Sequence, residues 1–129
     1  MAKKVLMIDD DPEFVDAISN LLDAKGYEVH TASNGKDGVA LAKAEDPDLI
    51  LLDVMMTTKH EGFDVARELH EDPKAKDTPI LMMTGIRREM NLPFGFEPDE
   101  AWLPVKQVLE KPVKPEVLLR AIDEHIRKS

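Results

Sequence analysis

Three short, uninterrupted apolar runs place the strongest constraint on how this chain can fold. They are Val5 to Ile8, Leu49 to Leu52 and Ile80 to Met83, and none shows the polar alternation of a strand with one face in water. Such runs are typical of strands that are buried on both faces. The sequence therefore predicts a parallel sheet with helices on both sides.

Weaker patterns supply the remaining elements. Two more strands are expected at Tyr27 to Ala32, which alternates more, and at Val105 to Leu109, which prolines flank. The first expected helix begins at Asp11-Pro12 and stops at Gly26, and its apolar residues share one face: Phe14, Val15, Ile18, Leu21 and Leu22. A short second helix is expected around Val39, Ala40 and Ala42 after Asn34-Gly35, and a third at Phe63 to His70. The last is expected at Pro115 to Arg127, with Val117, Leu118, Ala121, Ile122 and Ile126 inward. Alternating strands and helices predict an α/β fold with a doubly wound, five-stranded parallel sheet.

The bulk composition narrows the class of protein. A chain of 129 residues with 43% hydrophobic residues is the size of one domain with one real core. The formal charge of −9 argues against nucleic acid or an anionic membrane surface as a partner. There are no cysteines, and only a few apolar residues follow the N-terminal Met-Ala-Lys-Lys. We therefore expect no disulfide, no signal peptide and no membrane span, and a cytoplasmic location.

Polar residues follow four of the predicted strands. Asp9 and Asp10 come after the first strand, Asp53 after the third, Thr84 after the fourth and Lys111 after the fifth. The carboxyl ends of parallel strands lie at one edge of a sheet, where such folds bind ligands. We therefore expect these five side chains to meet, and Asp53, which interrupts the apolar stretch "LLDVMM", to belong to an acidic pocket.

The chemistry of that pocket points to a divalent cation and a phosphoryl group. Three crowded carboxylates repel one another unless a cation joins them, and oxygen ligands without thiolates favour Mg²⁺. An ammonium from Lys111 and a hydroxyl from Thr84 would bind a phosphoryl group that arrives on Asp53. Asp53 would then be a nucleophile that forms an acyl phosphate.

Four motifs carry a resemblance to a known family. They are "LMIDDDPEF", "DLILLDVMM", "PILMMTG" and "LEKPVKPEVL", in this order and spacing. Over nearly its whole length the chain resembles bacterial response-regulator receiver domains, which have a flavodoxin-like fold. The resemblance implies that Asp53 is the phosphoacceptor and that Asp9, Asp10, Asp53 and the Met55 carbonyl are Mg²⁺ ligands. By the same resemblance, Thr84, Lys111, Met55 and the Gly85 N–H contact the phosphoryl group. It also implies that a sensor histidine kinase or a histidine phosphotransfer protein is the donor.

The chain departs from the family pattern near the site. Thr57 replaces the usual proline four residues after the phosphoacceptor, and Gly62 lies one residue later than the usual glycine. Val108 stands where the family tends to have an aromatic ring that changes rotamer on phosphorylation. A β-branched aliphatic side chain cannot provide that readout. Met55 and Ile86 are apolar where polar residues influence hydrolysis, so we expect a long-lived acyl phosphate.

The largest departure is the segment Gly85 to Val105, where the family has its fourth helix. Pro93, Pro98 and Pro104 forbid a long regular helix, so an irregular, proline-rich segment is expected in its place. The segment contains Phe94, Phe96 and Trp102. It is expected to be either a cover that fills the place of the missing helix or an exposed patch for a partner.

The four histidines, His30, His60, His70 and His125, show no metal-ligand spacing in the sequence, and only His60 falls in the loop beside the expected site. We interpret residues 1–129 as one receiver domain without an output domain, whose phosphorylation changes a surface that an unknown downstream protein reads. One alternative is a binding module of the same fold that is not phosphorylated. Another is a Mg²⁺-dependent phosphatase, although Met55 stands where that class has an aspartate.

Overall fold

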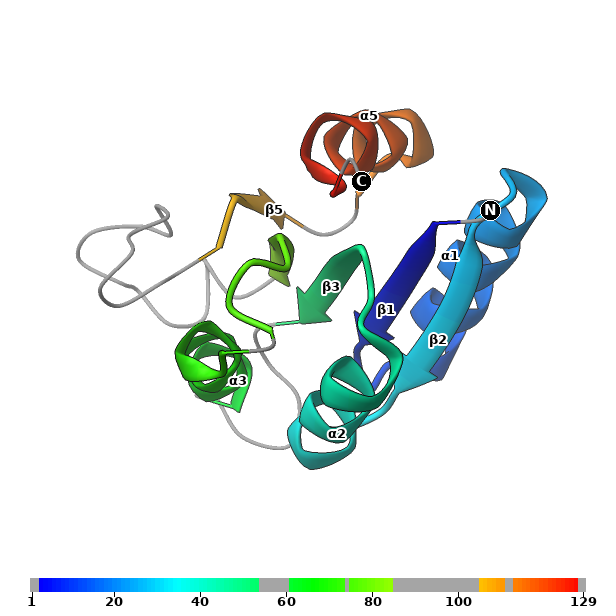
Figure 1. Cartoon of the computed structure of the whole chain (residues 1–129). Coiled ribbons are helices and arrows are strands. Elements are labelled where there is room, and N and C mark those ends of the chain that lie inside the picture. The colour runs from blue at the N-terminus through cyan, green and yellow to red at the C-terminus, as the bar shows by residue number, and fades with distance from the viewer. Residues whose placement is uncertain (1–2, 54–60, 74, 85–104, 111–112, 128–129) are drawn as a thin grey trace.

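The computed structural model describes residues 3–53, 61–73, 75–84, 105–110 and 113–127 (Figure 1). Its strands are β1 (Lys4–Ile8), β2 (Glu28–Ala32), β3 (Leu49–Asp53), β4 (Ile80–Thr84) and β5 (Gln107–Glu110). The helices in these ranges are α1 (Pro12–Ala24), α2 (Gly35–Glu45), α3 (Glu61–Glu71) and α5 (Pro115–His125). Residues 85–104, where an irregular proline-rich segment is expected, lie outside the described residues.

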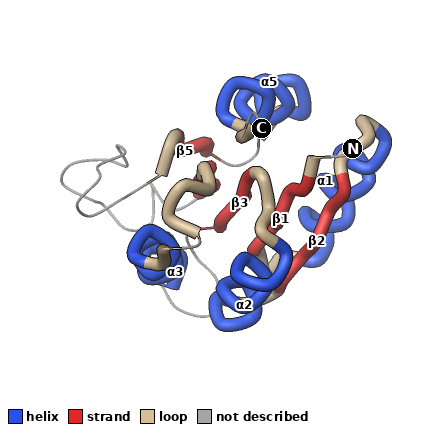
Figure 2. The backbone as a smooth tube through the Cα atoms, viewed as in Figure 1, coloured by secondary structure: helices blue, strands red, loops and turns tan. Residues whose placement is uncertain are grey.

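The five strands form one parallel sheet in the order β2-β1-β3-β4-β5. The chain leaves β1 for the edge strand β2, returns past β1 to β3 and then continues to the opposite edge. This arrangement confirms the predicted doubly wound sheet. Helices α1 and α5 cover one face of the sheet, and α2 and α3 cover the other (Figures 1 and 2).

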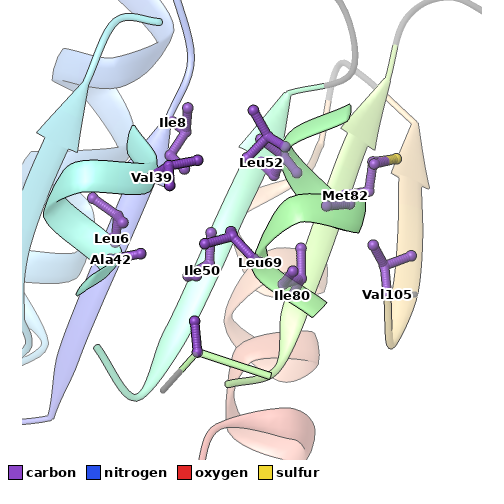
Figure 3. Packing of buried hydrophobic residues seen from close by; sticks show 13 residues of the cluster. Leu6, Ile8, Val39, Ala42, Ile50, Leu52, Leu69, Ile80, Met82 and Val105 are labelled. Atoms are coloured by element: carbon purple, nitrogen blue, oxygen red, sulfur yellow. The ribbon is translucent and has the colours of Figure 1, made fainter. Parts of the chain in front are cut away.

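Each strand sends alternate side chains to the two faces, and this alternation builds two cores. Leu6 and Ile8 of β1 pack with residues of α2 and α3, in the cluster that Figure 3 shows. Val5 and Met7 pack instead with residues of α1 and α5. All five residues of β3 are buried. Burial on both faces explains why the central strands are uninterrupted apolar runs.

The helix starts follow the predicted capping signals. Asp11 caps α1, since its Oδ1 accepts hydrogen bonds from the N–H groups of Glu13 and Phe14 at 3.2 and 3.4 Å. Gly26 follows the helix with φ +91°, a left-handed conformation that explains why a glycine stops the helix here. Asn34 caps α2 and accepts from the Asp37 N–H at 2.8 Å.

The inward face predicted for the last helix is partly wrong. Val117 is 43% exposed, whereas Leu118, Ala121, Ile122 and Ile126 are buried as expected. Leu119, which lies on the opposite side of these four buried residues from Val117, packs against the core. The buried face is therefore centred towards Leu119, which turns Val117 to the solvent.

Other element bounds differ from the expectations. Helix α5 ends at His125 and not at Arg127, whose N–H bonds to the Asp48 carbonyl at 3.0 Å instead. Strand β5 begins at Gln107, after the buried Val105. Helix α3 is longer at both ends than Phe63 to His70, and α2, at 11 residues, is longer than the short helix expected.

Two tight contacts fix the arrangement of the elements. A Cβ atom placed on Gly38 of α2 would lie 2.6 Å from Cδ1 of Ile8, so only a glycine lets the helix sit this close to β1. At the other end of the sheet, the Lys3 ammonium donates to the Arg127 carbonyl at 2.7 Å, and the Arg127 guanidinium contacts Asp46 and Asp48. None of the helices in the described ranges has the length and apolarity needed to cross a bilayer.

Candidate functional site

Two acidic residues follow β1. Asp9 continues the ladder with β2, since its N–H bonds to the Ala32 carbonyl at 3.0 Å, and its side chain is buried. Its Oδ1 accepts from the Asp11 N–H at 2.9 Å, which ties the carboxylate to the start of α1. Asp10 is exposed. The turn from β1 into α1 therefore holds one carboxylate inside the edge of the sheet and presents the next to the solvent.

The third carboxylate comes from the neighbouring strand. Asp53 is the last residue of β3 and is 6% exposed. Because β1 and β3 are adjacent and parallel, Asp53 ends at the same edge as Asp9 and Asp10. One carboxylate oxygen from each of the three residues lies within 4.8 Å of the others. The structure thus brings together the three aspartates that were predicted from the sequence to form an acidic pocket.

The donor set suits a hard divalent cation. It consists of carboxylate oxygens from three residues, two of them buried, with the third open to solvent. Three negative charges in such a space are stable together only when positive charge compensates them. Mg²⁺ accepts oxygen ligands and retains some of its water, so the exposed side of the cluster fits its needs. The residues present therefore fit a magnesium ion.

A groove of about 770 Å³ opens beside the cluster, between α1 and α2. Asp9 and Asp10 line one end of it, and Asp16 and Asp37 add two more acidic side chains along its walls. Asp53 is not among the residues that line the groove, so the groove adjoins the cluster on the side of Asp9 and Asp10.

The remaining predicted site residues lie partly or wholly outside the described part of the chain. Thr84 is the last residue of β4 and pairs in register with Glu110 of β5, so both strands end at the edge where Asp53 lies. The Thr84 side chain is not described. Among the others, the following lie outside the described residues: Met55, Thr57, His60, Gly85, Ile86 and Lys111.

Two departures from the family pattern can be located. Gly62 is buried in the first turn of α3. Val108 is half-buried in β5, where it pairs with Met82 and packs against the core on the side of α2 and α3. An aliphatic side chain in this position is part of the packing between β5 and the core.

Sequence reasoning missed a second group of possible metal ligands. Glu28, His30 and Glu45 each offer a ligand atom, and these atoms lie within 4.8 Å of one another. The histidines had shown no ligand spacing along the sequence. The spacing of two between Glu28 and His30 on a predicted strand was the available signal, because residues i and i+2 share a face. The contribution of Glu45 depends on how α2 packs.

Comparison with known proteins identifies the class. The model of the response regulator receiver domain family matches residues 5–123. The chain belongs to this family, and it therefore has the regulatory, phosphoacceptor role of receiver domains in two-component signalling. The fold and the acidic edge described above agree with this assignment.

The relatives differ in how much of their length this chain covers. Protein PilH of Pseudomonas aeruginosa is 32% identical over 120 residues, which are 93% of this chain and 94% of PilH. The DNA-binding dual master transcriptional regulator RpaA of Synechocystis is 40% identical over 94 residues, which are 73% of this chain and only 39% of RpaA. The solved receiver domain of the sensor histidine kinase PA1611 from Pseudomonas aeruginosa has a TM-score of 0.82 at 22% identity, covering 97% of this chain and 98% of that one. That likeness shows the fold.

Proposed function

We propose that Asp53 accepts a phosphoryl group from a phosphohistidine and that the phosphorylated chain signals through a protein contact. One observation carries the proposal: in a chain of the receiver family, the carboxylates of Asp9, Asp10 and Asp53 converge within 4.8 Å at the carboxyl edge of a parallel sheet. The phosphodonor is a sensor histidine kinase or a histidine phosphotransfer protein.

In the proposed reaction, a carboxylate oxygen of Asp53 attacks the phosphorus atom of the phosphohistidine. A P–O bond forms as the P–N bond breaks, and the imidazole nitrogen leaves with the bonding electron pair and takes up a proton. The product is an acyl phosphate on Asp53. Asp53 closes the buried strand β3, and its pairing in register with Met83 of β4 helps to hold its backbone in place for the transfer.

We assign the metal ligands to Asp9, Asp10 and Asp53, with the Met55 carbonyl added by resemblance to the family. When bound, Mg²⁺ supplies positive charge that offsets the charge of the phosphoryl oxygens during transfer. The solved receiver domain of PA1611 holds a magnesium ion in its active-site cleft, which supports the same assignment here. The hydrogen bond that Asp9 accepts from the Asp11 N–H keeps its carboxylate oriented for the metal.

The other contacts of the phosphoryl group are assigned by resemblance. The Thr84 hydroxyl and the Gly85 N–H donate hydrogen bonds to phosphoryl oxygens, and the Lys111 ammonium balances their charge. Met55 and Ile86 offer no polar group that would orient an attacking water, so the acyl phosphate persists. Replacing Met55 by Asn together with Ile86 by Glu should shorten its lifetime.

The test is phosphorylation by acetyl phosphate in the presence of Mg²⁺, followed by the intact mass. We expect one added phosphoryl group, no addition to Asp53→Asn and none when a chelator removes the Mg²⁺. Asp16→Asn is the matched control, because Asp16 lines the adjoining groove but is not one of the three clustered carboxylates, and it should be labelled normally. Absence of labelling in the unmodified chain would favour the constitutive binding module, and continuous phosphate release would favour a hydrolase.

A further inference from the structure

The second ligand cluster lies on the edge strand of the sheet. Glu28 and His30 belong to β2 and project to the same face, since they are two residues apart. Their partners in register on β1 are Lys4 and Leu6, so this cluster lies towards the amino end of the strands. Asp9, Asp10 and Asp53 lie at the carboxyl end, and the two clusters share no residue.

Helix α2 supplies the third ligand. Val39 and Ala42 of α2 pack in the same core cluster as Leu6, which places the end of the helix over this face of β1 and β2. Glu45 is the last residue of α2, and its ligand atom lies within 4.8 Å of those of Glu28 and His30. The cluster therefore joins an edge strand to the helix that covers it.

The backbone around the cluster is held firmly. The Glu28 N–H bonds to the Lys3 carbonyl at 2.9 Å, and the Lys4 N–H bonds to Oδ2 of Asp48 at 2.8 Å. The Lys4 ammonium donates to the Glu45 carbonyl at 3.1 Å. Because both strands and the end of the helix are tied to one another, the three ligand side chains start from fixed positions and lose little backbone freedom on binding.

The donor set differs in kind from that of the aspartates. His30 Nε2 lies 2.7 Å from Oε2 of Glu28, and the His30 side chain is 27% exposed. Imidazole nitrogen is a preferred ligand of zinc, copper and nickel ions, whereas magnesium favours oxygen ligands only. A nitrogen and two carboxylates leave a fourth, solvent-facing position for water, as in three-ligand zinc sites.

We propose that Glu28, His30 and Glu45 form a binding site for Zn²⁺ or a similar transition-metal ion. Two ionised carboxylates and a neutral imidazole balance the charge of a divalent ion. The ligand atoms of Glu28 and His30, now 2.7 Å apart, separate by roughly 0.6 Å on binding, since tetrahedral ligand bonds of about 2.0 to 2.1 Å keep neighbouring donor atoms farther apart than a hydrogen bond does.

The neighbouring groups set the conditions for binding. The hydrogen bond from His30 is the main cause that holds the pKa of Glu28 below its ordinary value, so this carboxylate is ionised at neutral pH. An ion at Nε2 needs the lone pair of that nitrogen, so it binds the ring in the form that carries its proton on Nδ1. Lys4 Nζ lies 3.6 Å from Oε2 of Glu45, and its positive charge opposes the ion.

The experiment is a titration of the whole chain with Zn²⁺ at saturating Mg²⁺, followed by the imidazole NMR resonances. These resonances report the site directly, whatever happens at the aspartates. We expect those of His30 to shift and those of His125 to stay, because His125 Nε2 contacts Gln107 at 3.1 Å and not a carboxylate. The ion should also raise the midpoint of thermal unfolding, since it binds only the folded chain.

Variants at each position sharpen the test. His30→Ala and Glu45→Gln should each weaken Zn²⁺ binding about tenfold or more, a loss typical for a disturbed metal site. Lys4→Gln should tighten it, because the variant removes a positive charge that lies beside Glu45 and opposes the ion. His70→Ala is the matched control, because His70 is exposed on α3 and belongs to neither ligand cluster, and it should bind like the unmodified chain.

Several results would overturn the proposal. One is a His30 resonance that does not move at Zn²⁺ concentrations that shift other histidines. Another is equal Zn²⁺ affinity in the unmodified chain and in both His30→Ala and Glu45→Gln. Because Glu45 lies on a different element from His30, loss of folding in one variant leaves the other as a test. None of these results depends on phosphorylation of Asp53.

Discussion

The contact between Gly38 and Ile8 determines how close α2 can lie to β1, and replacing Gly38 with alanine tests it. The added Cβ would lie 2.6, 2.8 and 2.9 Å from Cδ1, Cγ1 and Cγ2 of Ile8. Ordinary contacts between carbon atoms are about 3.5 to 4.0 Å. Ile8 is fully buried, so turning its side chain away from the helix would drive a methyl group into other core residues.

Two opposing terms set the size of the effect. Overpacking a core by one methyl group costs about 1 to 3 kcal/mol. Alanine in place of glycine inside a helix gains about 1 kcal/mol. We therefore expect Gly38→Ala to lower the free energy of unfolding by about 1 kcal/mol. In an Ile8→Ala background the overlapping atoms are gone, so the same change should raise the free energy of unfolding by up to about 1 kcal/mol.

Urea unfolding of the unmodified chain, the two single variants and the double variant measures the coupling. The expected interaction energy between the positions is about 1 to 3 kcal/mol, well beyond the scatter of about 0.3 to 0.5 kcal/mol for independent sites. If Ile8→Ala is too unstable to measure, Ile8→Val removes only the 2.6 Å contact and should give partial relief. Additive effects, with Gly38→Ala stabilising in both backgrounds, would refute the packing argument.

Three further predictions follow from described contacts. Asp11→Ala removes the side-chain cap of α1 and should cost about 1 kcal/mol in urea unfolding, whereas Asp11→Asn should retain most of the stability. Arg127→Lys keeps the charge but loses the guanidinium contacts to the Asp46 carbonyl and side chain, and should cost about 1 kcal/mol at low salt, measured by thermal unfolding. His30→Ala removes the hydrogen bond that lowers the pKa of Glu28, so carboxyl NMR titration should show this pKa rise. Because the hydrogen bond lowers the pKa of Glu28, its contribution to the free energy of unfolding is present above the ordinary glutamate pKa and is lost as the pH falls. His30→Ala should lack this contribution, and an acid unfolding curve that is the same in His30→Ala and in the unmodified chain would contradict the assignment.

Much of the fold could be predicted because burial leaves a strong pattern. The run from Leu49 to Leu52 had to be a strand covered on both faces, and Asp53 at its end then had to lie at the edge of the sheet. The same logic places Asp9 and Asp10 beside it. The carboxyl ends of parallel strands coincide whatever the details of the loops, so the correct assignment of the strands and of their parallel direction was enough to predict this cluster.

Features that depend on how the elements pack could not be predicted. The pattern of the last helix contains both Val117 and Leu119, and only the position of the sheet decides that Leu119 packs inward while Val117 is exposed. The cluster of Glu28, His30 and Glu45 also requires α2 to end above β2. The distance of fifteen residues between His30 and Glu45 hides that contact in the sequence.

The contact between Lys3 and Arg127 brings the first and last described residues together, at the end of the sheet away from Asp53. A circularly permuted chain in which a short peptide joins these two ends would therefore keep every strand in its register, and the new termini could open in a surface loop. A fluorescent reporter fused at either end would also emerge on the side away from the carboxylates. Such fusions offer a way to follow this domain without covering its acidic edge.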